Sequence, residues 1–188
     1  MTRSQSIARL VLGVAMFIAI GGLPASVAVL AQVAQDVPSA DRGAALAVNY
    51  TRLRPQIATA GVLKDGAVPR LKTLGFATVV DLRGPDEGTA VEKKAVGDAG
   101  IRYVNIPVRG APTDAQVAEF ARVVEDAQNT PLLVHCASGN RVGAMWALYR
   151  AQKGAPAAVA LEEGRAIGLH PDRAAELRKR LDKTPPAR

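Results

Sequence analysis

Cys136 and Arg141 are the two residues whose types and spacing most clearly allow chemistry in this chain. An apolar run, residues 132–134, leads toward Cys136, and an apolar stretch begins again directly after Arg141. Such a strand-to-helix turn directs several backbone N–H groups at one point, where the start of the helix adds positive potential. That field favours the thiolate form of a cysteine and attracts an anion. The pattern therefore predicts a cysteine nucleophile that faces an oxyanion.

Cys136 is the single cysteine among the 188 residues. An unpaired cysteine is often a small buried hydrophobe, but a leftover cysteine in an exported protein indicates a reactive thiol or a bond between chains. The glycine-containing loop and the nearby Arg141 favour the reactive thiol. We predict that Cys136 is the catalytic nucleophile and that Arg141 holds two oxygens of a tetrahedral anion.

The loop between these two residues is predicted to bind the substrate. Its backbone amides would donate to the anion, and the residues expected to do so are Ala137, Ser138, Gly139, Asn140 and Val142. Gly139 permits a close backbone approach or a positive φ. Ser138 would donate either to the thiolate or to the loop itself. His135 is expected to point into the core and to brace the loop by hydrogen bonding. The alternative, a direct general-base role, is disfavoured because neighbouring strand residues face opposite sides.

The N-terminus has the pattern of a secretory leader. Two arginines and no acid precede an uncharged stretch from residue 10 to residue 31, which contains a Gly-Gly-Leu-Pro break. This pattern predicts a signal peptide over residues 1–31, cleaved after Ala31 or alternatively after Ala34, and a periplasmic or secreted protein. The other interpretation is an uncleaved anchor, since the stretch is long enough to span a bilayer and tether the domain to a membrane.

The rest of the chain alternates between strand and helix patterns. One domain is expected over residues 49–182, after a linker at 32–48 and before a tail at 183–188. Apolar and β-branched runs predict strands at 56–60, 76–82, 101–108 and 132–135. Caps and apolar spacing predict helices at 68–73, 89–99, 113–128, 142–153, 156–167 and 172–181. The alternation predicts an α/β fold of three layers, a mainly parallel sheet with helices on both faces.

Composition and motifs argue against several other functions. The formal net charge is +7, and the positive residues are spread along the chain. Aromatic residues make up only 4% of the sequence, so there is little to stack on bases and we expect no nucleic-acid partner. His135 and His170 lie far apart and are joined by no second cysteine, so they form no local metal-binding motif. We therefore expect neither a metal nor another cofactor.

The residues around the cysteine form a wider pattern over residues 49–169. It comprises His135-Cys136, Arg141-Val142-Gly143, the run 74–83, Ile106-Pro107-Val108 and Gly164-Arg165. This pattern resembles the cysteine-dependent tyrosine and dual-specificity phosphatases, in particular the phosphatase-like domain of beta-lactamase hydrolase-like proteins. The resemblance implies a phosphatase-like fold and a phosphocysteine intermediate on Cys136. The implied partner is a small anionic substrate or a phosphorylated protein.

One feature of the loop departs from that family. The phosphatase signature has five residues between its cysteine and its arginine, whereas only Ala137 to Asn140 separate Cys136 from Arg141. The shorter spacing resembles that of rhodanese sulfur transferases, whose loop holds a persulfide. The flanking residues favour phosphate, so we predict an exported phosphatase-like hydrolase. The alternatives are a sulfur transferase with a Cys136 persulfide and a non-catalytic anion-binding module.

The proton donor of such a hydrolase is the least obvious residue. In the resembled family it is an Asp on the loop after the strand that ends near Val108, but here that loop, residues 109–112, has no carboxylate. Asp114 is the nearest candidate for the general acid, although its position also suits a helix cap. Asp86 and Glu87 are alternatives, because the strand before them ends at the same edge of the sheet.

Overall fold

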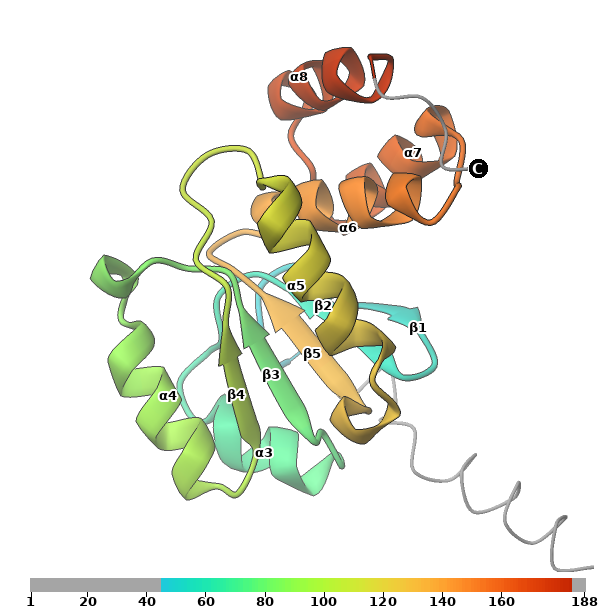
Figure 1. Cartoon of the computed structure of the whole chain (residues 1–188). Helices are drawn as coiled ribbons and strands as arrows, with labels where there is room; N and C mark the ends of the chain where they lie inside the picture. The colour runs from blue at the N-terminus through green and yellow to red at the C-terminus, as the bar shows by residue number, and fades with distance from the viewer. Residues whose placement is uncertain (1–44, 184–188) are drawn as a thin grey trace, which may run out of the picture.

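A five-stranded sheet forms the centre of the protein. The computed structural model describes residues 45–183, and the strand order across the sheet is β1-β2-β5-β3-β4 (Figure 1). Neighbouring strands run parallel except β1, which pairs antiparallel with β2. The strands are β1 (Thr51–Arg54), β2 (Ile57–Ala60), β3 (Thr78–Asp81), β4 (Arg102–Asn105) and β5 (Leu132–His135). The sheet is thus mainly parallel, as the sequence predicts.

Alternate residues of the central strands face two separate cores. Val80, Leu132 and Val134 pack in one core with residues of α5 and α6, while Val79 and Leu133 pack in the other with residues of α3 and α4. This alternation follows from the two-residue period of a strand. These helices are α3 (Ala67–Thr73), α4 (Thr89–Asp98), α5 (Asp114–Glu125) and α6 (Asn140–Gln152). Helices on both faces confirm the predicted three-layer architecture.

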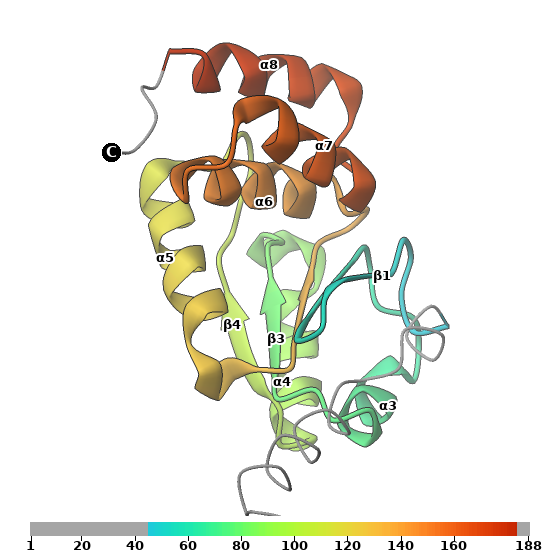
Figure 2. The same cartoon turned by 90° about the vertical axis from the view of Figure 1, so that its right-hand side faces the viewer.

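Two further helices extend the α6 side of the molecule. They are α7 (Ala157–Ile167) and α8 (Pro171–Leu181), and both contact α6. Figures 1 and 2 show that α6, α7 and α8 lie together beyond the carboxyl ends of the strands. The 3-10 turns η1 (Pro85–Glu87) and η2 (Ala127–Asn129) complete the described elements. The helices therefore frame the end of the sheet where the cysteine loop lies.

A close approach of two glycines lets α6 and α7 pack against each other. A Cβ atom built on Gly143 would lie 2.5 Å from the carbonyl oxygen of Gly164. In the reverse direction, a Cβ on Gly164 would lie 2.7 Å from the carbonyl oxygen of Gly143. Any side chain at either position would push the two helices apart. This contact sets the position of α7 against the first half of α6.

Most element boundaries agree with the sequence prediction, and a few differ. The strand expected to reach residue 108 ends at Asn105, and the helix expected to reach residue 128 ends at Glu125, before η2. Helix α6 begins at Asn140 instead of Val142. The strand β1 was not predicted, because its Thr-Arg-Leu-Arg sequence has only one apolar residue. It lies at the antiparallel edge of the sheet, where a polar sequence is tolerated.

The predicted leader at 1–31 and most of the linker lie outside the described residues, as do residues 184–188 of the tail. Within residues 45–183, no helix is both long enough and apolar enough to cross a membrane.

Candidate active site

Cys136 lies between the end of β5 and the start of α6, as the sequence predicts. Its residue is 1% exposed, and its backbone N–H donates to the carbonyl oxygen of Ala60 at 3.3 Å. Gly139 caps α6 at φ +93°, a conformation that side chains rarely adopt. The Gly139 amide nitrogen lies 3.1 Å from Sγ of Cys136 and donates to it. The loop therefore directs a backbone donor at the sulfur, as an anion-stabilising turn should.

Neighbouring segments hold the loop in this orientation. The Val62 N–H donates to the carbonyl oxygen of Ala137 at 2.9 Å, and the Asn49 side chain donates to that of Ser138, also at 2.9 Å. In a trans peptide unit the C=O and N–H groups point in opposite directions. With these two carbonyls bound outward, the following N–H groups point toward the inside of the loop. The arrangement suits the predicted role of the loop amides.

The remaining predicted binding residues fix the loop to its surroundings. The Asn140 side-chain oxygen accepts the backbone N–H of His170 at 3.0 Å, which connects the loop to the start of α8. Val142 is fully buried in the core of α5 and α6, so only its backbone could serve a ligand. A Cβ on Gly139 would lie 2.7 Å from the carbonyl oxygen of Ile167. Substitution of Gly139 would therefore displace the loop.

Arg141 points its guanidinium at Glu87 of η1. Nη1 and Nη2 donate to the two carboxylate oxygens at 2.7 and 2.6 Å, which makes a two-bond fork. Nη1 also lies 3.3 Å from the carbonyl oxygen of Val108. The hydrogen bonds from Arg141 lower the pKa of Glu87 to about 2, although partial burial opposes them. The structure thus brings together the carboxyl end of β3, the end of β4 and the cysteine loop.

The other carboxylates considered as proton donors are paired with cations other than Arg141. Asp114 is the first residue of α5, where Thr113 and Gln116 form a capping box, and its carboxylate binds Arg180 of α8 at 2.6 Å. Asp86 binds Arg109 at 3.2 Å. Sequence reasoning named Glu87 only as an alternative and did not foresee its contact with Arg141. The available signal was its place directly after a buried strand of the parallel sheet.

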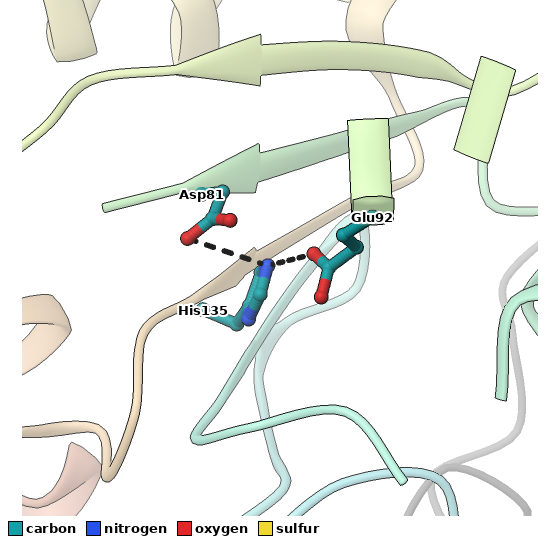
Figure 3. Close-up of side chains that lie close together, drawn as sticks. All are labelled: Asp81, Glu92 and His135. Carbon is teal, nitrogen blue, oxygen red and sulfur yellow. Dashed lines mark ion pairs between the residues drawn. The ribbon is translucent and has the colours of Figure 1, made fainter. Parts of the chain in front are cut away.

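A largely buried cluster of charged side chains surrounds His135, the residue before Cys136 (Figure 3). His135 Nε2 lies 2.7 Å from Oε1 of Glu92 and 3.7 Å from Oδ1 of Asp81. Arg83 donates through Nη2 to both carboxylates, at 2.8 Å for Asp81 and 2.6 Å for Glu92. Burial raises the pKa of Asp81, but the hydrogen bonds from Arg83, the charge of His135 and the Tyr103 hydroxyl outweigh it and lower that pKa overall. The sequence predicted that His135 braces the loop from the core. In the structure Asp81 and Glu92 hold the His135 side chain in place.

The cluster contains the donor atoms of a metal site but is organised as an ion-pair network. Ligand atoms of Asp81, Glu92 and His135 all lie within 4.8 Å of one another. However, the guanidinium of Arg83 already forms hydrogen bonds to both carboxylates. A divalent cation there would have to share these carboxylates with an adjacent positive charge. The arrangement fits a structural role beneath the cysteine loop better than it fits a metal.

Two known proteins share sequence similarity with part of this chain. The chain is 30% identical over 109 residues to the beta-lactamase hydrolase-like protein of Agrobacterium fabrum, a match of 55% of this chain and 25% of that protein. It is 33% identical over 99 residues to probable NAD kinase 2, chloroplastic, of Oryza sativa subsp. japonica, a match of 47% of this chain and 10% of that protein. The chain thus spans a quarter or less of the length of these relatives.

A solved structure and a family model also resemble this chain, and both bear on its family assignment. The crystal structure of P. aeruginosa TpbA superimposes with a TM-score of 0.58 at 26% sequence identity, over 72% of this chain and 87% of that one. A family model described as "DSP-PTPase phosphatase fused to NAD+ Kinase" (PTP-NADK) matches residues 53–178. The resemblance to cysteine-dependent phosphatases is thereby confirmed. The chain belongs to the PTP-NADK family, within the superfamily of cysteine phosphatase-like domains.

Proposed function

We propose that this protein is a phosphate-ester hydrolase in which Cys136 attacks phosphorus. The observation that carries the proposal is the environment of its sulfur. Sγ accepts the Gly139 amide at the start of α6, and Arg141 lies in the first turn of the same helix. Together with the family match over residues 53–178, this favours a thiolate that receives a phosphoryl group.

Each part of the loop has a role in the proposed reaction. The Cys136 thiolate bonds to phosphorus while the ester oxygen leaves with the electron pair of the P–O bond. Arg141 and the loop amides hold the oxygens that carry charge in the transition state. A water molecule then attacks the phosphocysteine, which releases inorganic phosphate and restores the thiolate. No metal is needed for these steps, because the positive groups come from Arg141 and the start of α6.

The short loop keeps sulfur transfer as a second candidate. Four residues separate Cys136 from Arg141, as in the rhodanese spacing. In that reaction the thiolate would bond to the outer sulfur of thiosulfate and form a persulfide, while the S–S bond of thiosulfate breaks and sulfite leaves. An exported location and a small anionic or phosphoprotein substrate stay predictions for either chemistry.

Phosphate release tests the proposal. The purified protein should release phosphate from 4-nitrophenyl phosphate, and Cys136→Ser should abolish this activity. Arg141→Lys should lower kcat by about 10²-fold, because a lysine cannot donate two parallel bonds to the phosphoryl oxygens. Arg54→Lys is the matched control and should keep wild-type activity, since Arg54 is at the end of β1, pairs with Glu163 and is 46% exposed. Failure to release phosphate, with conversion of thiosulfate and cyanide to thiocyanate, would establish sulfur transfer instead.

A further inference from the structure

We propose that Glu87 is the general acid of the hydrolysis, released for this task when the substrate's phosphoryl group takes its place on Arg141. The inference rests on the proposed phosphatase function and deepens it. The loop after β4, residues 109–112, holds no carboxylate that could serve as the general acid.

The contact between Glu87 and Arg141 has the geometry of a bound oxyanion. Two parallel N–H groups of Arg141 donate to the two oxygens of one carboxylate, at 2.6 and 2.7 Å. The same two N–H groups would donate to two equatorial oxygens of a phosphoryl group. The carboxylate and the phosphoryl group therefore compete for one fork. A phosphoryl group that takes this Nη1/Nη2 edge of the guanidinium displaces Glu87, and in the proposed reaction the freed carboxyl group then lies beside the reacting ester.

The attachment of Glu87 allows such a displacement. It is the last residue of the short turn η1 (Pro85–Glu87), and Gly88 follows it at φ +83°. Its side chain is 30% exposed, so a rotation does not disturb the core. Its carboxylate also accepts the backbone N–H of Gly84 at 2.7 Å. The hydrogen bond from Gly84 keeps the carboxyl group near the cysteine loop after the substrate has displaced it from Arg141.

Other carboxylates near this edge of the sheet are held by other cations. Asp86 binds Arg109 on the surface at 3.2 Å and is 65% exposed. Asp114 binds Arg180 at 2.6 Å and is 97% exposed. Asp81 and Glu92 are held by Arg83 beneath the loop. Among the described residues, Glu87 is the one carboxylate with a hydrogen bond to Arg141.

Displacement would also change the proton affinity of Glu87 in the required direction. In the free protein its pKa is about 2, first because of the hydrogen bonds from Arg141 and further because of the Gly84 amide and the charge of Arg83. Loss of the Arg141 bonds removes the main cause of this low pKa. The negative phosphoryl group and the Cys136 thiolate nearby then raise it, because like charges favour the protonated acid.

The proton balance of the two steps is complete. In the first step Cys136 Sγ bonds to phosphorus, the P–O bond to the alcohol breaks, and the Glu87 carboxyl group gives its proton to the leaving oxygen. In the second step the Glu87 carboxylate takes a proton from the attacking water, and the P–S bond breaks to release phosphate and the thiolate. Glu87 takes up its proton from solvent when the phosphoryl group displaces it from Arg141, and it acts first as an acid and then as a base. It returns the proton to solvent when phosphate leaves and the ion pair with Arg141 forms again, which restores the starting state.

The dependence on the leaving group tests this role. Phenyl phosphate releases a phenol with a pKa of about 10, like that of tyrosine, and this leaving oxygen needs a proton. The anion of 2,4-dinitrophenol leaves without one. We expect Glu87→Gln to lower kcat on phenyl phosphate by about 10²-fold or more, the usual contribution of a general acid, and on 2,4-dinitrophenyl phosphate by less than about threefold. The ratio of the two rates in one preparation does not depend on how much of the variant has folded.

Two further variants make the result specific. Glu87→Asp keeps a carboxyl group with a shorter reach and should recover part of the activity on phenyl phosphate. Glu125→Gln is the matched control, because Glu125 also pairs with a cation, Lys153 at 2.7 Å. Glu125 is the last residue of α5, and this end of α5 lies near the start of β5, whereas the cysteine loop follows the end of that strand (Figure 1). This control should behave as wild type on both esters.

Other outcomes would overturn the inference. An equal loss of kcat on both esters would mean that Glu87 only orients Arg141. An equal gain on both would mean that it only competes with the substrate. In either case wild type would still be an active phosphatase, and the proposed function would stand. If wild type released phosphate from neither ester, the proposed function would fail and this inference with it.

Discussion

Arg141 and Glu87 form a two-bond ion pair across 54 residues of sequence, with both N···O distances at or below 2.7 Å. The pair joins the first turn of α6 to the 3-10 turn η1, which follows β3. Together with a contact to the carbonyl oxygen of Val108, it fixes the orientation of the guanidinium. The consequences for stability and for catalysis can be measured separately.

The Arg141–Glu87 pair should make stability depend on pH in the acid range. The pKa of Glu87 is about 2 in the folded protein, below its ordinary value of 4.5. A carboxyl group with a lowered pKa stabilises the fold above the ordinary value, and this stabilisation is lost as pH falls through 4.5 toward 2. In urea unfolding, the free-energy difference between wild type and Glu87→Gln should therefore be larger at pH 7 than at pH 3. A difference that stayed constant or grew in acid would contradict the pairing.

Loss of the buried charge of Asp81 should lower the free energy of unfolding much more than loss of a surface charge. Asp81 is fully buried and bonds to Arg83, so Asp81→Asn leaves a buried guanidinium without its main partner. We expect the free energy of unfolding to fall by about 3–5 kcal/mol. Asp98→Asn is the control, because Asp98 pairs with Lys94 on the surface of α4 and is 64% exposed, and it should cost less than about 1 kcal/mol. Similar losses in the two variants would show that the cluster contributes little.

Glycine-to-alanine changes in two helices should have opposite effects. Gly143 on α6 lies against Gly164, and its new Cβ would be 2.5 Å from a carbonyl oxygen, so Gly143→Ala should destabilise the protein by about 1–3 kcal/mol. Nothing lies within 4 Å of a Cβ built on Gly97 of α4. Gly97→Ala should therefore stabilise it by about 0.5–1 kcal/mol, the usual helix preference. Thermal unfolding followed by circular dichroism measures both, and a stabilised Gly143→Ala would contradict the close helix packing.

Asp114 provides a direct test between two assignments of the proton donor. Its carboxylate binds Arg180 of α8 and lies in the first turn of α5, so we expect Asp114→Asn to keep the wild-type ratio of rates on phenyl and 2,4-dinitrophenyl phosphate. A selective loss on phenyl phosphate would instead establish Asp114 as the general acid, as sequence reasoning suggested. Steady-state kinetics on the two esters distinguishes these results.

The layers of this fold were predictable because local patterns determine them. The buried strand β5 was predicted at Leu132–His135, which is where it lies, since an apolar run before a glycine-containing loop allows few alternatives. The edge strand β1 was missed because its residues are half exposed and mostly polar. The start of α6 was placed two residues late, since Gly139, and not a polar side chain, caps that helix.

The site was predictable only where its residues are neighbours in sequence. Cys136, Gly139 and Arg141 share one loop, and their relation follows from the strand-to-helix turn. The contacts of Arg141 with Glu87 and of His135 with Glu92 join segments that are 54 and 43 residues apart. Their formation depends on how η1 lies against the start of α6 and how α4 lies against β5, which no local pattern specifies. The order of the strands indicates which segments lie near Arg141 and His135. Only the packed structure shows which carboxylate each of them contacts.

The most direct test of the account is the mass of the protein trapped during turnover. Wild type mixed with an aryl phosphate and quenched in acid should carry an addition of about 80 Da on the peptide that contains Cys136, the mass of one phosphoryl group on the nucleophile. Cys136→Ser should carry none under the same conditions. Two results together would contradict the phosphatase account. These are a wild-type protein that gains no mass from the aryl phosphate, and the same protein gaining about 32 Da, one sulfur atom, from thiosulfate.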